Sequence, residues 1–299
     1  MSPPTIADTA EVMRTTGWAD YALLDSGHGR KLERYGPYTV VRPEPQCLWS
    51  PRLGAEAWDG ADAVFDPTDE EDAGRWRFGQ PRPPESWPLA WGEVRFQGRF
   101  TAFRHLAFFP EQAANWAWLD AQVRAADGQP RVLNLFGYTG VASLVMAAAG
   151  AAVTHVDASK KAVGWARENA ALSGLAERPV RWITEDARKY VQREVRRGST
   201  YEGIILDPPK YGRGPDGEVW RLFEDVPQLA GLCAQLLSEN ARFLVLNAYA
   251  ERISGAALAG LLAEKLAGRA GRIEWGELDL VEARGDRAVG MSFFARWSA

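Results

Sequence analysis

After residue 110 the sequence alternates short apolar runs with longer segments whose apolar residues recur at helical spacing. Runs typical of buried strands fall at 131–136, 152–157, 180–184, 202–207 and 241–247. Helical patterns follow them at 140–149, 160–173, 187–197, 220–238 and 253–267. Strands that alternate with helices predict an α/β fold whose parallel sheet is covered on both faces, because each crossover helix packs back onto the sheet.

Two regions depart from this alternation. Extended runs at 272–282 and 287–297, joined by Arg284-Gly285-Asp286, predict a terminal antiparallel hairpin. Before residue 110, short extended patterns such as 37–41 and 93–96 are separated by proline-rich breaks such as 80–84. We therefore predict a small β-rich domain over 1–110, with substrate recognition as a candidate role, and an α/β domain over 111–299.

Composition narrows the class of protein. The 299 residues are 46% hydrophobic and 25% charged, enough for a buried core. The sequence has no apolar run of about 18 residues and no basic start followed by an apolar stretch, so we expect a cytoplasmic protein without a membrane partner. Cys47 and Cys233 are too few for a disulfide framework or a zinc cage, and we expect no metal. A net charge of −4 indicates that any RNA contact is local.

The first strand of the α/β domain runs into a glycine turn. Its sequence is Asn134-Leu135-Phe136-Gly137-Tyr138-Thr139-Gly140. Glycine lets the backbone approach a ligand at the carboxyl end of this strand, where doubly wound sheets bind nucleotides. An ordinary strand-to-helix turn is the alternative. A nicotinamide site fits less well than a methyl-donor site, because the G-x-G-x-x-G spacing would place glycine at position 135, which is leucine.

Acidic residues follow the next two strands. Asp157 ends the second strand, twenty residues past Gly137, where a carboxylate can accept both hydroxyls of a ribose. Ala158 and Ser159 follow it. After the third strand, Asp186 is placed to accept an adenine amino group while the adjacent backbone completes the edge. A surface position for the first carboxylate, and an N-cap role for the second at helix 187–197, are the alternatives.

A proline pair follows the fourth strand, in the run Asp207-Pro208-Pro209-Lys210-Tyr211. Two prolines lack N–H groups and have fixed φ, so their carbonyls stand in a rigid frame. With Asp207 these carbonyls can orient an amino or ring nitrogen, while Tyr211 offers a face for a planar base and Lys210 a charge for a phosphate. The alternative is a simple loop terminator. The glycine-rich loop 212–217 is predicted to be mobile and to close over the acceptor.

Four motifs occur in order: NLFGYTG, VDASKKAVGWARENAALSGL, EDARKY and LDPPKYGRG. With them, residues 105–250 resemble the family that contains the bacterial 23S ribosomal RNA methyltransferases, which act on cytosine carbon 5 or guanine nitrogen 7. The resemblance implies a Rossmann-like class I fold and S-adenosyl-L-methionine as cofactor. Gln112, in a Phe-x-x-Gln-like segment, is expected at its methionine end. The predicted cofactor set is Gln112, Asn134, Phe136, Gly137, Tyr138, Thr139, Gly140, Asp157, Ala158, Ser159, Asp186, Ala187 and Asp207.

The resemblance favours a base of ribosomal RNA as the methyl acceptor. The acidic charge balance favours the alternative of a small-molecule or protein methyltransferase, and a catalytically silent binding module is a third reading. Relatives that methylate carbon 5 have a cysteine after the fifth strand, but segment 243–250 has none. We therefore expect direct transfer to a nitrogen, without a covalent intermediate and with Asn247 near the acceptor. A basic helix face, formed by Lys189, Arg193, Arg196 and Arg197, is either an RNA contact or a solvated surface.

Overall fold

The computed structural model describes residues 3–68, 74–249 and 252–299, and it divides into two compact units. An α/β unit contains residues 3–13, Asn115–Leu278 and Ser292–Ala299, and a β-rich unit contains Arg14–Ala114 and Asp279–Met291. Residues 3–13 thus group with the α/β unit, and Asp279–Met291, around the tip of the terminal hairpin, group with the β-rich unit. The functional division at 110/111 stays a prediction.

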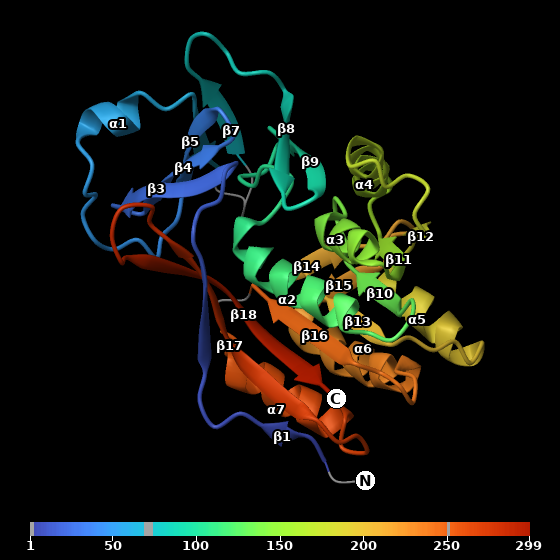
Figure 1. The fold of residues 1–299 in the computed structure, drawn as a ribbon. Coiled ribbons are helices and arrows are strands. Elements are labelled where there is room, and N and C mark those ends of the chain that lie inside the picture. The colour runs from blue at the N-terminus through green and yellow to red at the C-terminus, as the bar shows by residue number, and fades with distance from the viewer. Residues whose placement is uncertain (1–2, 69–73, 250–251) are drawn as a thin grey trace. The chain divides into compact units, whose positions relative to one another are not determined.

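The α/β unit is built on one sheet, drawn in Figure 1. Its spatial order is β12 (Val180–Thr184), β11 (Ala152–Asp157), β10 (Arg131–Leu135), β13 (Gly203–Leu206), β16 (Phe243–Ala248), β18 (Ala288–Ser298), β17 (Arg272–Val281) and β1 (Thr5–Ile6), with β2 (Glu11–Thr15) also paired to β17. Strands β10 to β13 and β16 pair in parallel, whereas β18 runs antiparallel to β16. This arrangement confirms the predicted class I sheet with its terminal antiparallel hairpin.

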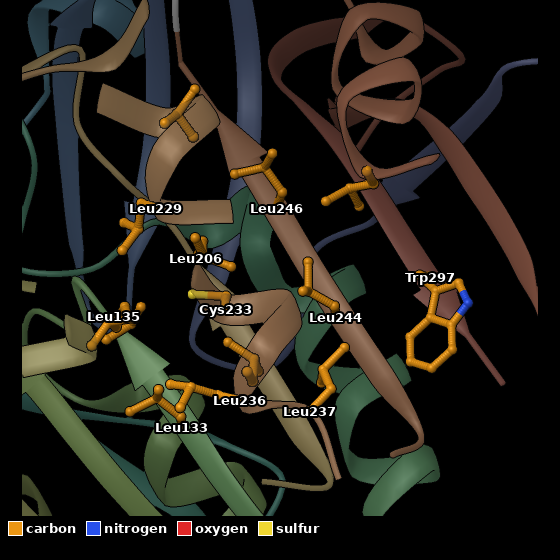
Figure 2. Packing of buried hydrophobic residues seen from close by; sticks show 14 of the residues in the cluster. Leu133, Leu135, Leu206, Leu229, Cys233, Leu236, Leu237, Leu244, Leu246 and Trp297 are labelled. Carbon is orange, nitrogen blue, oxygen red and sulfur yellow. The ribbon is translucent and has the colours of Figure 1, made fainter. Parts of the chain in front are cut away.

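Helices cover both faces of this sheet (Figure 1). They are α2 (Ala113–Arg124), α3 (Val141–Ala149), α4 (Lys160–Leu172), α5 (Ala187–Arg196), α6 (Leu222–Leu236) and α7 (Gly255–Lys265). Alternate residues of β10 separate the two cores: Leu133 and Leu135 pack with α5, α6 and α7, whereas Val132 packs with α2 and α3. Figure 2 shows Cys233 of α6 among the leucines of the first core. No helix within the described ranges is long and apolar enough to span a bilayer.

The segment after the proline pair differs from its prediction. It forms a short hairpin of β14 (Tyr211–Arg213) and β15 (Val219–Arg221), where the sequence predicts a mobile loop followed by a helix from 220. Backbone pairing of β15 with β14 holds these residues extended, so α6 begins only at Leu222. Helix α2 is a further element that the sequence pattern did not predict.

The β-rich unit contains two sheets. One has the order β3 (Tyr21–Gly27), β4 (Arg30–Tyr35), β5 (Tyr38–Pro43), β6 (Ala63–Pro67) and β7 (Gly74–Phe78); the other pairs β8 (Ser86–Trp91) with β9 (Val94–Arg99). Two short helices, α1 (Ala55–Asp59) and η1 (Pro110–Gln112), complete the unit. Its strand content confirms the predicted β-rich N-terminal region.

A buried ion pair lies in the core of the β-rich unit. Arg42 of β5 donates Nε and Nη2 to the two carboxylate oxygens of Glu33 on β4, each at 2.7 Å. The hydroxyls of Tyr21 and Tyr35 donate to the same carboxylate at 2.9 and 3.0 Å. Burial by itself would raise the pKa of Glu33, but Arg42, Lys31 and these hydrogen bonds outweigh it and lower the pKa from 4.5 to about 2.

Acid should therefore unfold this protein partly through Glu33. Because its folded-state pKa lies below the ordinary value, its stabilising contribution is present above pH 4.5 and is lost as the pH falls toward 2. Glu33→Gln should destabilise the protein by roughly 3–5 kcal/mol at pH 7, since it leaves a buried guanidinium uncompensated, and should flatten the loss of stability below pH 4.5. Urea unfolding at a series of pH values measures both effects. The exposed Glu93→Gln is the control, and an unchanged pH slope in Glu33→Gln would contradict this assignment.

Candidate active site

The backbone register brings four strand ends to one level. Leu135 of β10 is paired with Val156 of β11 on one side and with Leu206 of β13 on the other, and Leu206 is paired with Leu246 of β16. The next residue of each chain segment therefore lies at the same edge of the sheet. These residues are Asp157, Phe136, Asp207 and Asn247. The strand order reverses between β10 and β13, and doubly wound sheets bind their ligands at such a reversal.

The turn after β10 has an unusual backbone. Phe136, Tyr138 and Gly140 all have positive φ, at 58°, 48° and 83°. For the two aromatic residues this conformation costs about 1–2 kcal/mol each, because Cβ approaches the following carbonyl. Such strain persists where the surrounding structure over-determines it, and it is common at ligand sites. The predicted glycine turn is therefore more specialised than an ordinary strand-to-helix connection.

Contacts from neighbouring strands and helices hold this turn in place. Asp157 accepts hydrogen bonds from the backbone N–H of Tyr138 at 2.9 Å and of Ser159 at 2.8 Å, one on each oxygen. Asn169 of α4 donates to the carbonyl of Thr139 at 2.9 Å. Burial raises the pKa of Asp157, opposed by the two backbone hydrogen bonds. Each carboxylate oxygen keeps a second lone pair, so Asp157 can fix the turn and still accept a ribose hydroxyl.

A buried polar cluster forms the floor of the turn. Asn134 donates to the hydroxyl of Ser143 at 2.8 Å, and that hydroxyl lies 3.0 Å from Nδ1 of His155. A Cβ at Gly137 would lie 2.5 Å from the His155 ring, so only glycine fits over this floor. Burial lowers the pKa of His155 to about 3, which keeps the imidazole neutral. The side chain of Asn134 supports the turn from below, and its contact with the cofactor stays a prediction.

Asp186 caps helix α5. Its Oδ1 accepts hydrogen bonds from the N–H groups of Arg188 at 3.0 Å and of Lys189 at 3.1 Å. Among the described residues none donates to Oδ2, so this oxygen is the one that can meet an adenine amino group. The cap and the ligand contact are thus compatible in one side chain, with Ala187 following on the same turn. Ser159 has a comparable role at α4, where its hydroxyl accepts from Ala162 N–H at 3.2 Å.

The proline pair is engaged from the hairpin that follows it. The indole N–H of Trp220 donates to the carbonyl of Pro209 at 2.7 Å, and the indole ring lies 4.9 Å from the ring of Phe136. Trp220 is only 3% exposed. One side chain therefore joins the turn after β10 to the turn after β13. The carbonyl of Pro209 thus already has one donor, which leaves it a second lone pair, and its predicted contact with the acceptor stays a prediction. Tyr211 is half exposed, as base stacking requires.

Arg188 extends this connection to the third strand end. Its guanidinium donates to Asp225 of α6 at 2.6 Å and to the carbonyl of Val219 at 2.8 Å, and it stands over the Trp220 ring at 5.9 Å. Its Nε lies 3.6 Å from Asp186. Arg188 and Trp220 were missed by sequence reasoning. The only signal for them was their place beside two motifs, since their partners lie far away in the sequence.

The basic face of α5 is largely neutralised. Arg193 forms a bidentate pair with Glu185, and Arg197 pairs with Glu194 at 3.2 Å. Lys189 contacts Asp216 and Glu218 in the loop of the β14–β15 hairpin. These pairs hold the hairpin loop against α5 and weaken the expectation that this face meets RNA phosphates.

Two predicted residues lie elsewhere. Gln112 ends η1 in the β-rich unit, where it is buried, and its contact with the cofactor stays a prediction. Asn247 is the penultimate residue of β16, at the level of the site, and its Oδ1 accepts a hydrogen bond from Asn115 Nδ2 at 3.0 Å. Asn247 is buried, so the structure gives it a packing partner in α2 in addition to its predicted place near the acceptor.

Comparison with known proteins identifies the class. Residues 54–240 match the model of a family described as S-adenosylmethionine-dependent methyltransferase. A solved S-adenosylmethionine-dependent methyltransferase from Agrobacterium tumefaciens is 50% identical over 99% of this chain and 96% of its own, with a TM-score of 0.95. The chain therefore belongs to the S-adenosylmethionine-dependent methyltransferases.

Curated relatives match a shorter region. Ribosomal RNA large subunit methyltransferase K/L of Shewanella frigidimarina is 36% identical over 118 residues, which are 39% of this chain and 16% of the relative. Ribosomal RNA large subunit methyltransferase I of Shewanella denitrificans is 42% identical over 81 residues, which are 27% of this chain and 20% of the relative. The chain thus spans a fifth or less of the length of these relatives.

The residues at the strand ends fit S-adenosyl-L-methionine. The ligand has a ribose with two hydroxyls and an adenine with one amino group, and the site offers a carboxylate for each at Asp157 and Asp186. These two carboxylates are acceptors for the hydroxyl and amino groups of the ligand, which agrees with the family assignment.

Asp157→Ala should weaken binding of S-adenosyl-L-methionine by roughly 1–3 kcal/mol, the scale for losing charge-assisted hydrogen bonds. It removes acceptors for the ribose and the two backbone hydrogen bonds that fix the turn. Isothermal titration calorimetry measures the change. Asp120→Ala, which removes a helix-surface carboxylate paired with Arg124, is the matched control and should bind normally. Equal affinities for the two variants would remove Asp157 from the cofactor site.

Trp220→Phe tests the connection between the two turns. The substitution keeps a ring against Phe136 but deletes the hydrogen bond to Pro209. We expect cofactor affinity within about twofold of wild type and a methyl-transfer rate at least about tenfold lower, because small displacements of the acceptor frame are costly. Transfer of labelled methyl groups to an extract of cells that lack the protein provides the rate. Trp297→Phe is the control. Trp297 is also buried, and its indole N–H donates to the backbone carbonyl of Ala270 at 3.1 Å. A rate equally reduced in both variants would indicate a general effect on folding.

Proposed function

We propose that this methyltransferase acts on a base of RNA, with ribosomal RNA as the leading substrate, and transfers the methyl group to a nitrogen. The observation that carries the proposal is the acceptor motif: Asp207 directly follows β13 at the strand reversal, and the half-exposed ring of Tyr211 stands four residues later on the anchored hairpin. The two Shewanella relatives are both named ribosomal RNA large subunit methyltransferases, which supports the same substrate class.

The proposed chemistry needs placement more than it needs an acid or a base. S-adenosyl-L-methionine supplies an electrophilic methyl group on a sulfonium sulfur. A ring nitrogen of a base already has a free lone pair, whereas the lone pair of an amino nitrogen is freed when acceptors hold its N–H groups, so the protein must hold either nitrogen in line with the methyl group. The N–CH3 bond forms as the S–CH3 bond breaks, its electron pair stays on the sulfur of the departing thioether, and an amino nitrogen then releases its proton to water. Asp207 and the carbonyl of Pro208 accept hydrogen bonds from the base, and Tyr211 stacks on its face. Lys210 balances the charge of a neighbouring phosphate.

The cofactor is held in this proposal by the residues predicted from the sequence. Asp157 accepts the ribose hydroxyls, Asp186 the adenine amino group, and the turn 136–140 lines the methionine part. Gln112 contacts the methionine end of the cofactor. Asn134 supports the turn that lines the cofactor. The β-rich unit contributes to substrate recognition.

A covalent intermediate has no suitable thiol in the described ranges. Cys233 is fully buried in the core of the α/β unit (Figure 2), and burial raises the pKa of its thiol. Cys47 lies in the β-rich unit, where burial also raises its pKa, to about 11. A thiol must ionise to attack a base, and neither environment favours that. Both cysteines are unbridged.

A small-molecule or protein acceptor is the second candidate. The pairing of Arg193, Arg197 and Lys189 with carboxylates favours it, because those charges are less available to phosphates. The first candidate predicts a methylated RNA base as the product, and the second predicts a methylated protein or small molecule.

Mass analysis of nucleosides and of proteins from cells with and without this enzyme tests the proposal. We expect one methylated base to disappear from ribosomal RNA when the enzyme is absent and to return with wild type. Tyr211→Ala should restore it about 100-fold more slowly, since it loses acceptor placement, while binding cofactor normally. A methyl group missing from a protein or metabolite, with RNA unchanged, would establish the second candidate.

The double variant Cys47→Ser, Cys233→Ser should restore the same methylated base at a rate near that of wild type. The mechanism proposed for nitrogen requires no thiolate, so its loss removes nothing from the transition state. A substrate containing 5-fluorocytosine should give no stable adduct with wild type. A trapped adduct, or a folded but inactive double variant, would instead establish transfer to carbon 5.

A further inference from the structure

The β14–β15 hairpin has two different faces. Gly212 is paired with Trp220, whereas Tyr211 is paired with Arg221 and Arg213 with Val219. Side chains alternate across a strand, so Trp220 lies on one face and Tyr211, Arg213 and Arg221 lie on the other. The first face is fixed to the α/β unit by the bond from Trp220 to Pro209 and by the ring of Phe136. We call the second the outer face.

The outer face presents aromatic surface to solvent. Tyr211 is 50% exposed, and Phe223, two residues after the hairpin at the start of α6, is 56% exposed. Within the described part of the α/β unit, these are the aromatic side chains that are classed as exposed. One exposed ring is unremarkable, but two beside a proposed acceptor motif indicate a contact surface.

The outer face also carries available positive charge. The side chain of Arg213 is exposed and forms no ion pair or hydrogen bond with any residue that the structure describes. Arg221 pairs with Glu224 at 3.3 Å, but both side chains are more than half exposed, and such pairs contribute little. Two cations of α5 differ, since Arg193 and Lys189 have close carboxylate partners. The hairpin therefore presents available guanidinium groups on the same face as the exposed ring of Tyr211.

We propose that the outer face of this hairpin, together with Phe223, is the contact surface for unpaired RNA next to the target nucleotide. The inference rests on the proposed function and extends it from the target base to its neighbours. Arg213 and Arg221 contact backbone phosphates, and Phe223 stacks on a flanking base. Aromatic rings beside cations bind single strands, whereas a duplex hides its base faces from such rings.

Binding of a labelled, unstructured twelve-nucleotide RNA, followed by fluorescence anisotropy at several salt concentrations, tests this surface. Arg213→Gln should weaken binding and reduce the slope of log affinity against log salt by about 0.7, the value for one phosphate contact on a single strand. Phe223→Ala should weaken binding about 5- to 100-fold with an unchanged slope, because stacking releases no counterions. Both variants should bind S-adenosyl-L-methionine as wild type does.

Matched controls come from the same unit. Arg167→Gln removes an exposed arginine of α4 that forms no ion pair with any described residue, and Val12→Ala trims an apolar side chain that is 52% exposed. Both should bind RNA normally. If wild type binds and methylates RNA while Arg213→Gln and Phe223→Ala behave like these controls, the surface is wrong and the proposed function stands. Tighter binding to a duplex of the same sequence would also overturn the surface. If wild type neither binds nor methylates RNA, the proposed function fails and the surface with it.

Discussion

The shared register of four parallel strands is the constraint on which this site depends. Backbone pairing of β11, β10, β13 and β16 places Asp157, Phe136, Asp207 and Asn247 at one edge, although 90 residues of chain separate the first from the last. A shift of one residue in any pair would turn the side chains of that strand to the other face. The apolar residues of these strands resist such a shift, because each belongs to one of two separate cores.

Given that register, two side chains unite the turns that follow the strands. Trp220 bonds Pro209 and packs on Phe136, and Arg188 connects the cap of α5 with Asp225. These contacts and those of Asp157 hold the strained turn at 136–140. The turn after β10, the turn after β13 and the hairpin are thus joined above the sheet, which suits the reaction that we propose, because its rate depends on placement.

Charge is distributed within the α/β unit in a way that the acidic composition conceals. Carboxylates of the same unit neutralise the basic face of α5, and these pairs tie the hairpin loop to that helix. Positive charge without a close partner is left at Arg213, beside exposed rings. A protein with a net charge of −4 can therefore offer a local surface for phosphates, provided that the contact is small.

The sequence by itself determined the five parallel strands, the helices that follow them and the terminal hairpin to within about three residues, because apolar periodicity records which side of each element is buried. It also determined which motifs follow the strands. Glycine favours turns with positive φ, aspartate favours helix N-caps, and proline fixes φ, so each is informative from the local sequence alone. The sequence did not predict α2 or the β14–β15 hairpin. Only the tertiary structure decided that Trp220 occupies the Pro209 carbonyl, that β15 delays the start of α6, and that Glu185 and Glu218 neutralise α5. These outcomes depend on pairs of residues separated by 8 to 29 positions and on hydrogen bonds that no single segment specifies.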